Sequence, residues 1–311
     1  MASRNYLRNW ARVPPALPYN WVCAVPATLD SIVAAARQSL SHRRQGADLR
    51  ALERAAACHQ PRGFRRRLES VAESGIAVIA ELKKASPSKG LIRANFSPAV
   101  LARELEAAGA AALSVLTDEQ FFQGSLEYLR QASSAASIPC LRKDFILDEF
   151  QILEARASSA DAVLLIVAAL SQHELVSLAM SARSHGLDAL CEAHDEGELQ
   201  RALDAGCDLI GINSRDLRTF EVTLDTALKL AKKIPPGVLR VAESGIHNGA
   251  DLARLKAAGY DAFLIGESLM KAERPGEALN KLIEDSTQHS SISEQQVFSS
   301  RLEAQSSKLP L

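Results

Sequence analysis

Acidic and basic residues end several short apolar runs of this sequence, which is where the strands of α/β enzymes carry their chemistry. The first run ends in Glu81-Leu82-Lys83, and strand side chains alternate between two faces, so Glu81 and Lys83 point the same way. Later runs end in Lys143 and Glu192. A lysine whose pKa is lowered by burial can act as a general acid, and a carboxylate can act as its base. These residues indicate acid–base catalysis.

Each of these residues has a plainer interpretation when taken alone. Glu81 and Lys83 could form a solvated strand edge, and a glutamate opposite a lysine could be a structural ion pair. Two further runs end in Asn213-Ser214-Arg215 and in Glu243-Ser244-Gly245, however, and five strand ends of one kind favour an active site. We expect the small residues 85–90 to form a flexible loop over it.

The last two apolar runs are followed by glycines that suit an anion. Ser244-Gly245 follows one run, and Gly266-Glu267 follows the other and leads into a helix. Glycine lets backbone N–H groups approach an anion, and a helix N-terminus adds its positive dipole end. Either motif taken alone could be an ordinary glycine turn. The pair predicts a phosphorylated small-molecule substrate.

A repeated unit supplies the elements that must position these residues. Helical periodicity ends in Ala-Gly at Gly109, Gly206 and Gly259, and an apolar run begins a few residues later each time. Such a pattern is typical of helix-to-strand junctions. Eight runs of strand length occur in all, at 78–83, 113–117, 138–143, 162–167, 189–192, 209–213, 239–244 and 262–266.

Strands that alternate with helices imply a parallel sheet covered on both faces. We therefore predict an α/β fold, a (β/α)₈ TIM barrel with an extra N-terminal helical segment that begins after Thr28 as N-cap. An open doubly wound sheet is the alternative. We expect one catalytic domain over 27–286, a flexible N-terminal extension over 1–26 and a flexible C-terminal tail over 287–311.

Composition excludes several classes of function. The 311 residues carry 36 Lys+Arg and 37 Asp+Glu, so the net charge of −1 gives no basic field for nucleic acid. No apolar run is long enough to span a membrane. Five cysteines without C-x-x-C spacing predict reduced thiols and a cytoplasmic protein. Arginines near the N-terminus are a weak transit-peptide signal, which we rank below a flexible extension.

Familiar cofactor and nucleophile motifs do not occur in the sequence. There is no H-E-x-x-H, G-x-S-x-G, P-loop or G-x-G-x-x-G motif. The histidines do not cluster as metal ligands, and we interpret His194 and His247, each two residues after a strand end, as loop residues. We expect no cofactor and no metal.

Five phrases at the strand ends resemble the indole-3-glycerol phosphate synthase family, in order and from about residue 28 to about residue 282. That family has a (β/α)₈ barrel with an extra N-terminal helical segment. The phrases are Ile79-Ala80-Glu81-Leu82-Lys83-Lys84-Ala85-Ser86-Pro87-Ser88, Leu141-Arg142-Lys143-Asp144-Phe145, Leu164-Leu165-Ile166-Val167-Ala168, Gly211-Ile212-Asn213-Ser214-Arg215-Asp216-Leu217 and Val241-Ala242-Glu243-Ser244-Gly245-Ile246.

The resemblance implies a reaction and a role for each catalytic residue. The reaction closes the indole ring of 1-(2-carboxyphenylamino)-1-deoxyribulose 5-phosphate, with loss of carbon dioxide and water. Lys143 resembles the general acid, and Glu192 resembles its carboxylate counterpart, which we expect on an opposing strand. Glu81 and Asn213 resemble residues that orient the substrate hydroxyls, and Lys83 resembles a lysine near the substrate carboxylate.

The resemblance also implies the substrate contacts. The phosphate would lie against Ser244, Gly245, Gly266 and Glu267, and Phe122 would pack on the anthranilate ring. Some relatives carry a hydroxyl residue in place of Glu267, so we expect its backbone rather than its carboxylate to face phosphate. The expected substrate and phosphate contacts in full are Ser86, Phe122, Arg215, Glu243, Ser244, Gly245, Gly266 and Glu267.

Two rival functions stay open at this point. One is a phosphosugar isomerase that acts one step earlier in the pathway, but its acid and base are a cysteine and an aspartate. The other is a binding module with a degenerate barrel, which would have lost Lys143 and Glu192, and both are present. The resemblance leaves association with other enzymes of the tryptophan pathway open.

Overall fold

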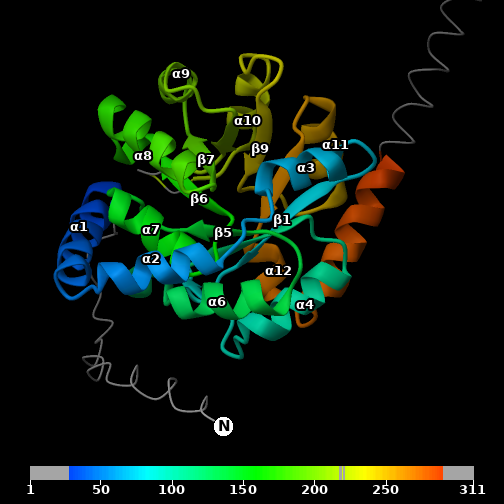
Figure 1. The fold of residues 1–311 in the computed structure, drawn as a ribbon. Coiled ribbons are helices and arrows are strands. Elements are labelled where there is room, and N and C mark those ends of the chain that lie inside the picture. Colours follow the sequence, from blue (N-terminus) through cyan, green and yellow to red (C-terminus); the bar gives the residue numbers. More distant parts are fainter. Residues whose placement is uncertain (1–27, 217–218, 220, 290–311) are drawn as a thin grey trace, which may run out of the picture.

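The computed structural model describes residues 28–216, 219 and 221–289. Within these residues eight parallel strands form one closed barrel, with neighbours in the order β1-β10-β9-β8-β7-β6-β5-β4. Helices surround the strands on the outside (Figure 1). The strands are β1 (Ala77–Leu82), β4 (Ala112–Leu116), β5 (Cys140–Lys143), β6 (Ala162–Ile166), β7 (Asp188–Ala193), β8 (Leu209–Asn213), β9 (Leu239–Glu243) and β10 (Ala262–Ile265).

These strands match the eight predicted apolar runs to within a few residues. Each strand pairs in parallel with the next, and β1 closes the ring because it pairs with both β10 and β4. The prediction of a (β/α)₈ barrel is confirmed. The alternative of an open doubly wound sheet is wrong, since a closed sheet has no edge strands.

Helices alternate with the strands, as the repeat predicted. Gly109, Gly206 and Gly259 have φ values of 88°, 73° and 100°, the left-handed backbone that glycine adopts at helix ends. The helices are α4 (Pro98–Ala107), α5 (Glu119–Phe122), α6 (Leu126–Ala135), α7 (Glu149–Ala157), α8 (Gln172–Ser184), α9 (Glu196–Asp204), α10 (Leu224–Ala231), α11 (Gly249–Ala257) and α12 (Glu267–Lys271), with a 3₁₀ turn η1 (Val167–Ala169) and a further helix over 275–289.

Three helices precede the barrel: α1 (Leu29–Gln45), α2 (Leu49–Cys58) and α3 (Phe64–Ala72). Thr28 is the N-cap of α1, as predicted, because its side chain accepts a hydrogen bond from the N–H of Ser31. Figure 1 shows α1 and α2 on one side of the barrel, and α2 packs along α7. Phe64 and Leu68 of α3 are fully buried against the first residues of the strands, so α3 closes the amino-terminal end of the barrel.

The core has two layers, which follow from the alternation of side chains along each strand. Ile79 of β1 and Leu141 of β5 belong to the cluster inside the barrel, together with Phe64 of α3. Val78 and Ala80 of β1 belong to the larger cluster between the barrel and the helices. Residues two positions beyond an interior residue therefore point into the carboxyl-terminal mouth.

A buried aspartate fastens the N-terminal segment to the barrel. Asp161 precedes β6, and its carboxylate accepts hydrogen bonds from Arg62 (as short as 2.5 Å) and from the N–H of Cys140 (2.7 Å). His59 Nε2 lies 3.3 Å from the same carboxylate. Burial would raise the pKa of Asp161, but the contact with His59 and the hydrogen bonds and charge of Arg62 lower it.

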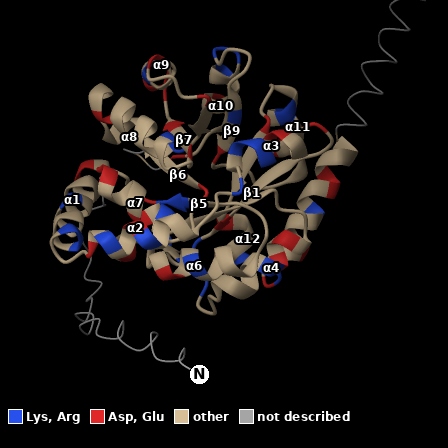
Figure 2. Ribbon diagram, in the orientation of Figure 1, with Lys and Arg blue, Asp and Glu red and all other residues tan. Residues whose placement is uncertain are grey.

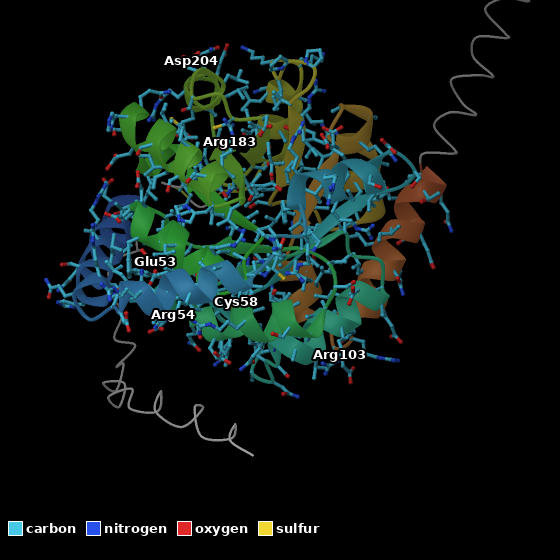
Figure 3. The ribbon with its side chains drawn as sticks, viewed as in Figure 1. Glu53, Arg54, Cys58, Arg103, Arg183 and Asp204 are labelled. Atoms are coloured by element: carbon cyan, nitrogen blue, oxygen red, sulfur yellow. The ribbon has the colours of Figure 1, made fainter. Side chains whose placement is uncertain are left out.

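The outer surface carries charges of both signs. Lys and Arg alternate with Asp and Glu around the outer helices (Figure 2), in keeping with the net charge of the chain. Figure 3 labels side chains that are exposed, among them Cys58, Arg103, Arg183 and Asp204. Of the cysteines that the structure describes, Cys58 is exposed and the others are buried, and all are free thiols. No helix in the described ranges is long and apolar enough to cross a membrane.

Part of the predicted tails lies outside the described residues. This is the case for all of 1–26 and for 290–311. Residues 287–289 of the predicted C-terminal tail continue the helix that begins at residue 275.

Candidate active site

One cavity opens at the carboxyl-terminal end of the barrel, and all thirteen predicted site residues line it. Leu29 and Ile32 of α1 also line the cavity, so the N-terminal segment reaches both ends of the barrel. The predicted residues in the lining are Glu81, Lys83, Ser86, Phe122, Lys143, Glu192, Asn213, Arg215, Glu243, Ser244, Gly245, Gly266 and Glu267.

Strand alternation explains why these residues converge. Lys143 lies two positions after Leu141, and Glu192 two positions after Leu190, both of which fill the barrel interior. Glu243 stands in the same relation to Val241. Three strands therefore place charged residues at one level above the apolar interior.

Lys143 makes the central contacts of the cavity. Its Nζ donates to Oε2 of Glu192 and to Oε2 of Glu243, at 2.6 Å in both cases. The strand of Glu192 is separated from that of Lys143 by β6 alone, so the expectation that these two residues lie on opposing strands is wrong. It is Glu243, on β9, that faces Lys143 from the opposite side of the barrel.

Charge decides the protonation states in this cluster. Burial would lower the pKa of Lys143, but the carboxylates of Glu192, Glu243 and Glu81 raise it well above its usual value. The expectation of a lowered pKa for Lys143 is thus wrong, because three carboxylates outweigh burial. Lys143 is an ammonium ion at neutral pH and holds a proton that it can donate.

The two carboxylates on Lys143 differ from each other. Burial would raise the pKa of Glu192, but Lys143 and His194 lower it well below its usual range. Burial, together with the charge of Glu192, raises the pKa of Glu243 to about 8, against the opposing effect of Lys143. Glu192 is therefore ionised at neutral pH, whereas Glu243 carries a proton.

Glu81 and Lys83 form a second ion pair in the cavity, with 2.6 Å between Lys83 Nζ and Glu81 Oε2. Gly266 lies directly against Glu81, and Gly211 lies directly against Glu243. A Cβ atom at either glycine would overlap the neighbouring carboxylate. Both glycines are thus required by the space that the glutamates occupy.

Asn213, the last residue of β8, and Arg215, two residues further on, are fixed by backbone contacts at this strand end. Asn213 Oδ1 accepts a hydrogen bond from the N–H of Arg215 (3.1 Å), which leaves its amide nitrogen as the donor toward the cavity. Arg215 pairs with Val222 through an isolated antiparallel bridge. The guanidinium of Arg215 lies 3.8 Å from the carboxylate of Glu267.

The segment after β1, expected to be a flexible loop, contains a short hairpin. The strands β2 (Ala85–Ser86) and β3 (Gly90–Leu91) form a short antiparallel hairpin, and Gly90, which follows the turn, has a φ of 64°. Ser86 is buried and lines the cavity. The small residues at this point serve close packing and a tight turn.

Phe122 closes another side of the cavity. It belongs to the short helix α5, whose N-cap Asp118 accepts hydrogen bonds from the N–H groups of Phe121 (2.6 Å) and Phe122 (3.3 Å). The ring centroid of Phe122 lies 6.5 Å from that of Phe145. Two aromatic rings thus form an apolar wall beside Lys143.

At the strand end after β9 the backbone has two successive positive φ angles, which turn backbone N–H groups toward one side, as at anion sites. Ser244 and Gly245 have φ values of 64° and 78°. Gly266 is the N-cap of α12, and Glu267 is its first residue. The carboxylate of Glu267 accepts a 2.6 Å hydrogen bond from Lys271.

The pKa of Glu267 follows from its neighbours. Burial would raise it, but the hydrogen bond and charge of Lys271 and the charges of Lys83 and Lys89 lower it. Four basic groups, Lys271, Lys83, Lys89 and Arg215, therefore surround this carboxylate and offset its charge.

Several residues of the site were missed by sequence reasoning. Asp118 follows β4 and lines the cavity; burial above all raises its pKa to about 6, and the same strand-end rule would have found it. His194, in the loop after β7 as interpreted, is half-buried, with Nε2 3.4 Å from Oε1 of Glu192. Arg142, the neighbour of Lys143, is fully buried outside the barrel, where it binds Asp144 at 2.9 Å. No sequence signal marked Arg142, whereas His194 follows the predicted strand end at Glu192 by two residues.

Among the described residues, no group of three or more histidine, cysteine, aspartate or glutamate side chains is arranged to hold a metal ion. Fold and site together define a (β/α)₈ barrel enzyme whose ammonium and carboxylate groups suit acid–base chemistry on a small anionic substrate.

Comparison with known proteins identifies the family. Residues 29–282 match the sequence model of indole-3-glycerol phosphate synthase. The indole-3-glycerol phosphate synthase of Koribacter versatilis is 58% identical over 257 residues, which cover 83% of this chain and 99% of that protein. The enzyme of the same name from Burkholderia ambifaria is 49% identical over 255 residues, or 82% and 98% of the two chains. The chain belongs to the indole-3-glycerol phosphate synthase family, an enzyme family of carboxy-lyases.

Solved structures support the fold alone. A thiamine phosphate pyrophosphorylase from Pyrococcus furiosus superposes with a TM-score of 0.51 at 17% identity, over 67% of this chain and 93% of that one. A mandelate oxidase variant superposes with a TM-score of 0.53 at 17% identity, over 77% and 84%. Such distant likeness is what a widely used barrel architecture leads one to expect.

Proposed function

We propose that this chain converts 1-(2-carboxyphenylamino)-1-deoxyribulose 5-phosphate to indole-3-glycerol phosphate, with release of carbon dioxide and water. The single observation that carries the proposal is the placement of Lys143 between Glu192 and Glu243, at the mouth of the barrel. An ammonium donor and an ionised carboxylate then stand within reach of one substrate. The catalytic domain corresponds to residues 27–286.

The substrate binds through its two ends. Its phosphate lies against the backbone of Ser244, Gly245 and Gly266, with Ser86 and Arg215 at the sides. Its anthranilate ring lies along Phe122. The 2.6 Å bond between Glu267 and Lys271 turns that carboxylate aside, so Glu267 meets the phosphate through its N–H group.

Ring closure is the first chemical step. The aromatic carbon that bears the carboxylate attacks the ribulose carbonyl carbon, and the carbonyl oxygen takes a proton from Lys143 as it becomes a hydroxyl. The high pKa of Lys143 keeps the proton in place until the alkoxide develops. Asn213 and Glu81 orient the sugar hydroxyls.

Decarboxylation follows from the electronic state of the closed ring. Closure leaves a cationic imine next to the carboxylate, so the electrons of the breaking carbon–carbon bond flow into the imine as carbon dioxide leaves. The substrate itself is the electron acceptor, and this step needs no cofactor.

Dehydration completes the indole. Glu192 removes a proton from the ring carbon next to the nitrogen, the former C1 of the ribulose, while the hydroxyl on the adjacent carbon leaves as water with a proton from an ammonium group. Lys83 can supply it directly, and Lys143 can supply it once it has regained from solvent the proton that it gave in ring closure. Glu81 holds Lys83 at 2.6 Å.

The test is a cofactor-free assay of the purified chain with the carboxyphenylamino-deoxyribulose phosphate, followed by indole fluorescence with and without EDTA. We expect an EDTA-insensitive rise of fluorescence. A flat trace from folded protein would contradict the proposal, and titration with phosphorylated sugars would then test simple binding.

Two expectations about the cellular setting stay predictions. We infer a cytoplasmic enzyme from its reduced cysteines, which fractionation of cells would check. Association with other enzymes of tryptophan biosynthesis is checked by co-purification with those enzymes.

A further inference from the structure

Glu192 has a second basic neighbour, His194, which lies behind it and outside the lining of the cavity. His194 Nε2 is 3.4 Å from Oε1 of Glu192, and the histidine side chain is only 10% exposed. The other carboxylate oxygen of Glu192, Oε2, faces Lys143 at 2.6 Å. The carboxylate therefore lies between two basic groups.

The imidazole ring of His194 is fixed from its far side. Its Nδ1 lies 2.9 Å from Oε2 of Glu198, and the same oxygen accepts a 2.8 Å hydrogen bond from the N–H of His194. Glu198 belongs to the first turn of α9, where its own N–H donates to Asp195. These contacts leave Nε2 beside Oε1 of Glu192, close enough for a charge interaction although no hydrogen bond joins the two atoms.

Lys143 by itself does not distinguish the two carboxylates that it touches, since Glu192 and Glu243 both lie 2.6 Å from its Nζ. His194, in contrast, contacts only Glu192 of the pair. Its extra contact favours the ionised form of Glu192, so that the proton held by the two carboxylates resides on Glu243.

The charges around these groups agree with that assignment. Burial would lower the pKa of His194, but Glu192 and Glu198 raise it to about 10, so His194 is cationic at neutral pH. The charged groups that face Glu192 are Lys143 from β5, Glu243 from β9 and His194 at the end of its own strand. Glu81 from β1 acts on it through Lys143.

We propose that His194, held by Glu198, is a positioning residue that keeps Glu192 ionised and oriented as the base of the reaction, while Glu243 carries the proton. The proposal rests on the role given above to Glu192. A purely structural role, as part of the turn between β7 and α9, is the competing explanation.

Dependence of kcat on pH separates these explanations, with three variants compared with the wild type. In His194→Gln we expect the acidic limb of kcat to move to higher pH by about one unit, because the cation beside Glu192 is lost. At pH values on the acidic limb itself this gives a loss of about tenfold in kcat, which recovers as the pH rises, with little change in KM. Glu198→Gln should move the limb in the same direction by less.

Asp195→Ala is the matched control. It removes the cap of α9 but leaves the ring contacts of His194, so it should lower Tm and leave the acidic limb in place. An unmoved limb in His194→Gln would overturn the proposal. An equal loss of kcat at every pH in that variant would also overturn it, since a structural role predicts that result.

A measurement on the wild type guards against poor folding of His194→Gln. In ¹⁵N-histidine spectra of the full chain, His194 is assigned as the ring whose signal changes in Glu198→Gln. Both of its ring nitrogens should stay protonated through about pH 8. A neutral ring at that pH would overturn the proposal. This readout does not need turnover, so failure of the proposed activity and failure of this inference are distinguishable.

Discussion

The ammonium group of Lys143 on β5 lies 2.6 Å from a carboxylate oxygen of Glu243 on β9, the strand on the opposite side of the barrel. The same ammonium group binds Glu192 at 2.6 Å. One cation therefore faces two buried carboxylates. The negative charges of Glu192 and Glu243 would repel each other, so one of the two carboxylates keeps a proton. That proton determines how the site responds to pH.

The first prediction concerns Glu243, whose pKa is raised to about 8. As the pH rises through that value, Glu243 ionises and adds a negative charge beside Lys143, which makes Lys143 a weaker acid. We expect kcat of the wild type to fall above about pH 8 and Glu243→Gln to lack that fall, with kcat at neutral pH within about tenfold of the wild type. If kcat of Glu243→Gln still falls above about pH 8, that fall is caused by the ionisation of another group.

Gly211 is expected to be necessary for the position of Glu243. A Cβ at residue 211 would overlap the Glu243 carboxylate, so Gly211→Ala should displace it by a fraction of an ångström or more. We predict a loss of kcat on the order of 10²-fold and a destabilisation of roughly 1–3 kcal/mol from overpacking.

Gly46→Ala is the matched control for Gly211→Ala, since the nearest atom to its Cβ would be the carbonyl oxygen of His42 at 3.8 Å. Its kcat should equal that of the wild type, and urea unfolding should show little change. Wild-type kcat in Gly211→Ala would mean that Glu243 does not need its observed position.

The fold could be predicted from the sequence because its signals are local. Apolar runs, the glycines that end helices and the alternation of side chains each involve neighbouring residues, and together they predicted Lys143, Glu192 and Glu243 at the ends of strands of a barrel. Alternation also explains why Glu81 and Lys83 share a face and form an ion pair.

What the sequence could not supply depends on residues that only the closed barrel brings together. The pKa of Lys143 is raised because carboxylates from β1, β7 and β9 converge on it, and no local pattern encodes that convergence. His194 resembles an ordinary loop residue in the sequence, and only the turn into α9 brings its ring to 3.4 Å from Glu192. The small residues after β1 predicted a loop, and the pairing of two of its short stretches as a hairpin was not predicted.

A prediction for the phosphate site concerns Glu267, whose carboxylate is bound by Lys271 and lies 3.8 Å from Arg215. Glu267→Gln removes a negative charge near the bound phosphate and frees both basic groups to act on it. We expect KM to fall a few fold with kcat unchanged, because the interaction is the same in the ground state and the transition state. Glu284→Gln, at an exposed position, should change neither constant. A raised KM in Glu267→Gln would show that the carboxylate helps binding.

Asp161 should contribute to stability and leave catalysis unaffected. Asp161→Asn breaks its buried ion pair with Arg62 far from the cavity, and we expect a loss of roughly 3–5 kcal/mol in the free energy of unfolding. Urea unfolding measures this loss, and kcat at room temperature should stay within about twofold.

The pH dependence of that loss follows from the lowered pKa of Asp161. A lowered pKa in the folded state stabilises the protein above the pKa of the unfolded chain, and this contribution disappears as the pH falls through the folded value. The stability difference between wild type and Asp161→Asn should therefore shrink under acid conditions. Asp204→Asn, at an exposed position on α9, is the control. A difference that grows on acidification would contradict the assignment.

Turnover and substrate affinity of Lys143→Ala test the central claim, that Lys143 donates the proton in ring closure. Because the phosphate and ring contacts remain, we predict that kcat falls by about 10³-fold or more while the substrate Kd, measured by equilibrium titration, stays within about tenfold. Lys281→Ala, an exposed lysine, should behave as the wild type. A Lys143→Ala variant that retains kcat within about tenfold of the wild type would contradict the account.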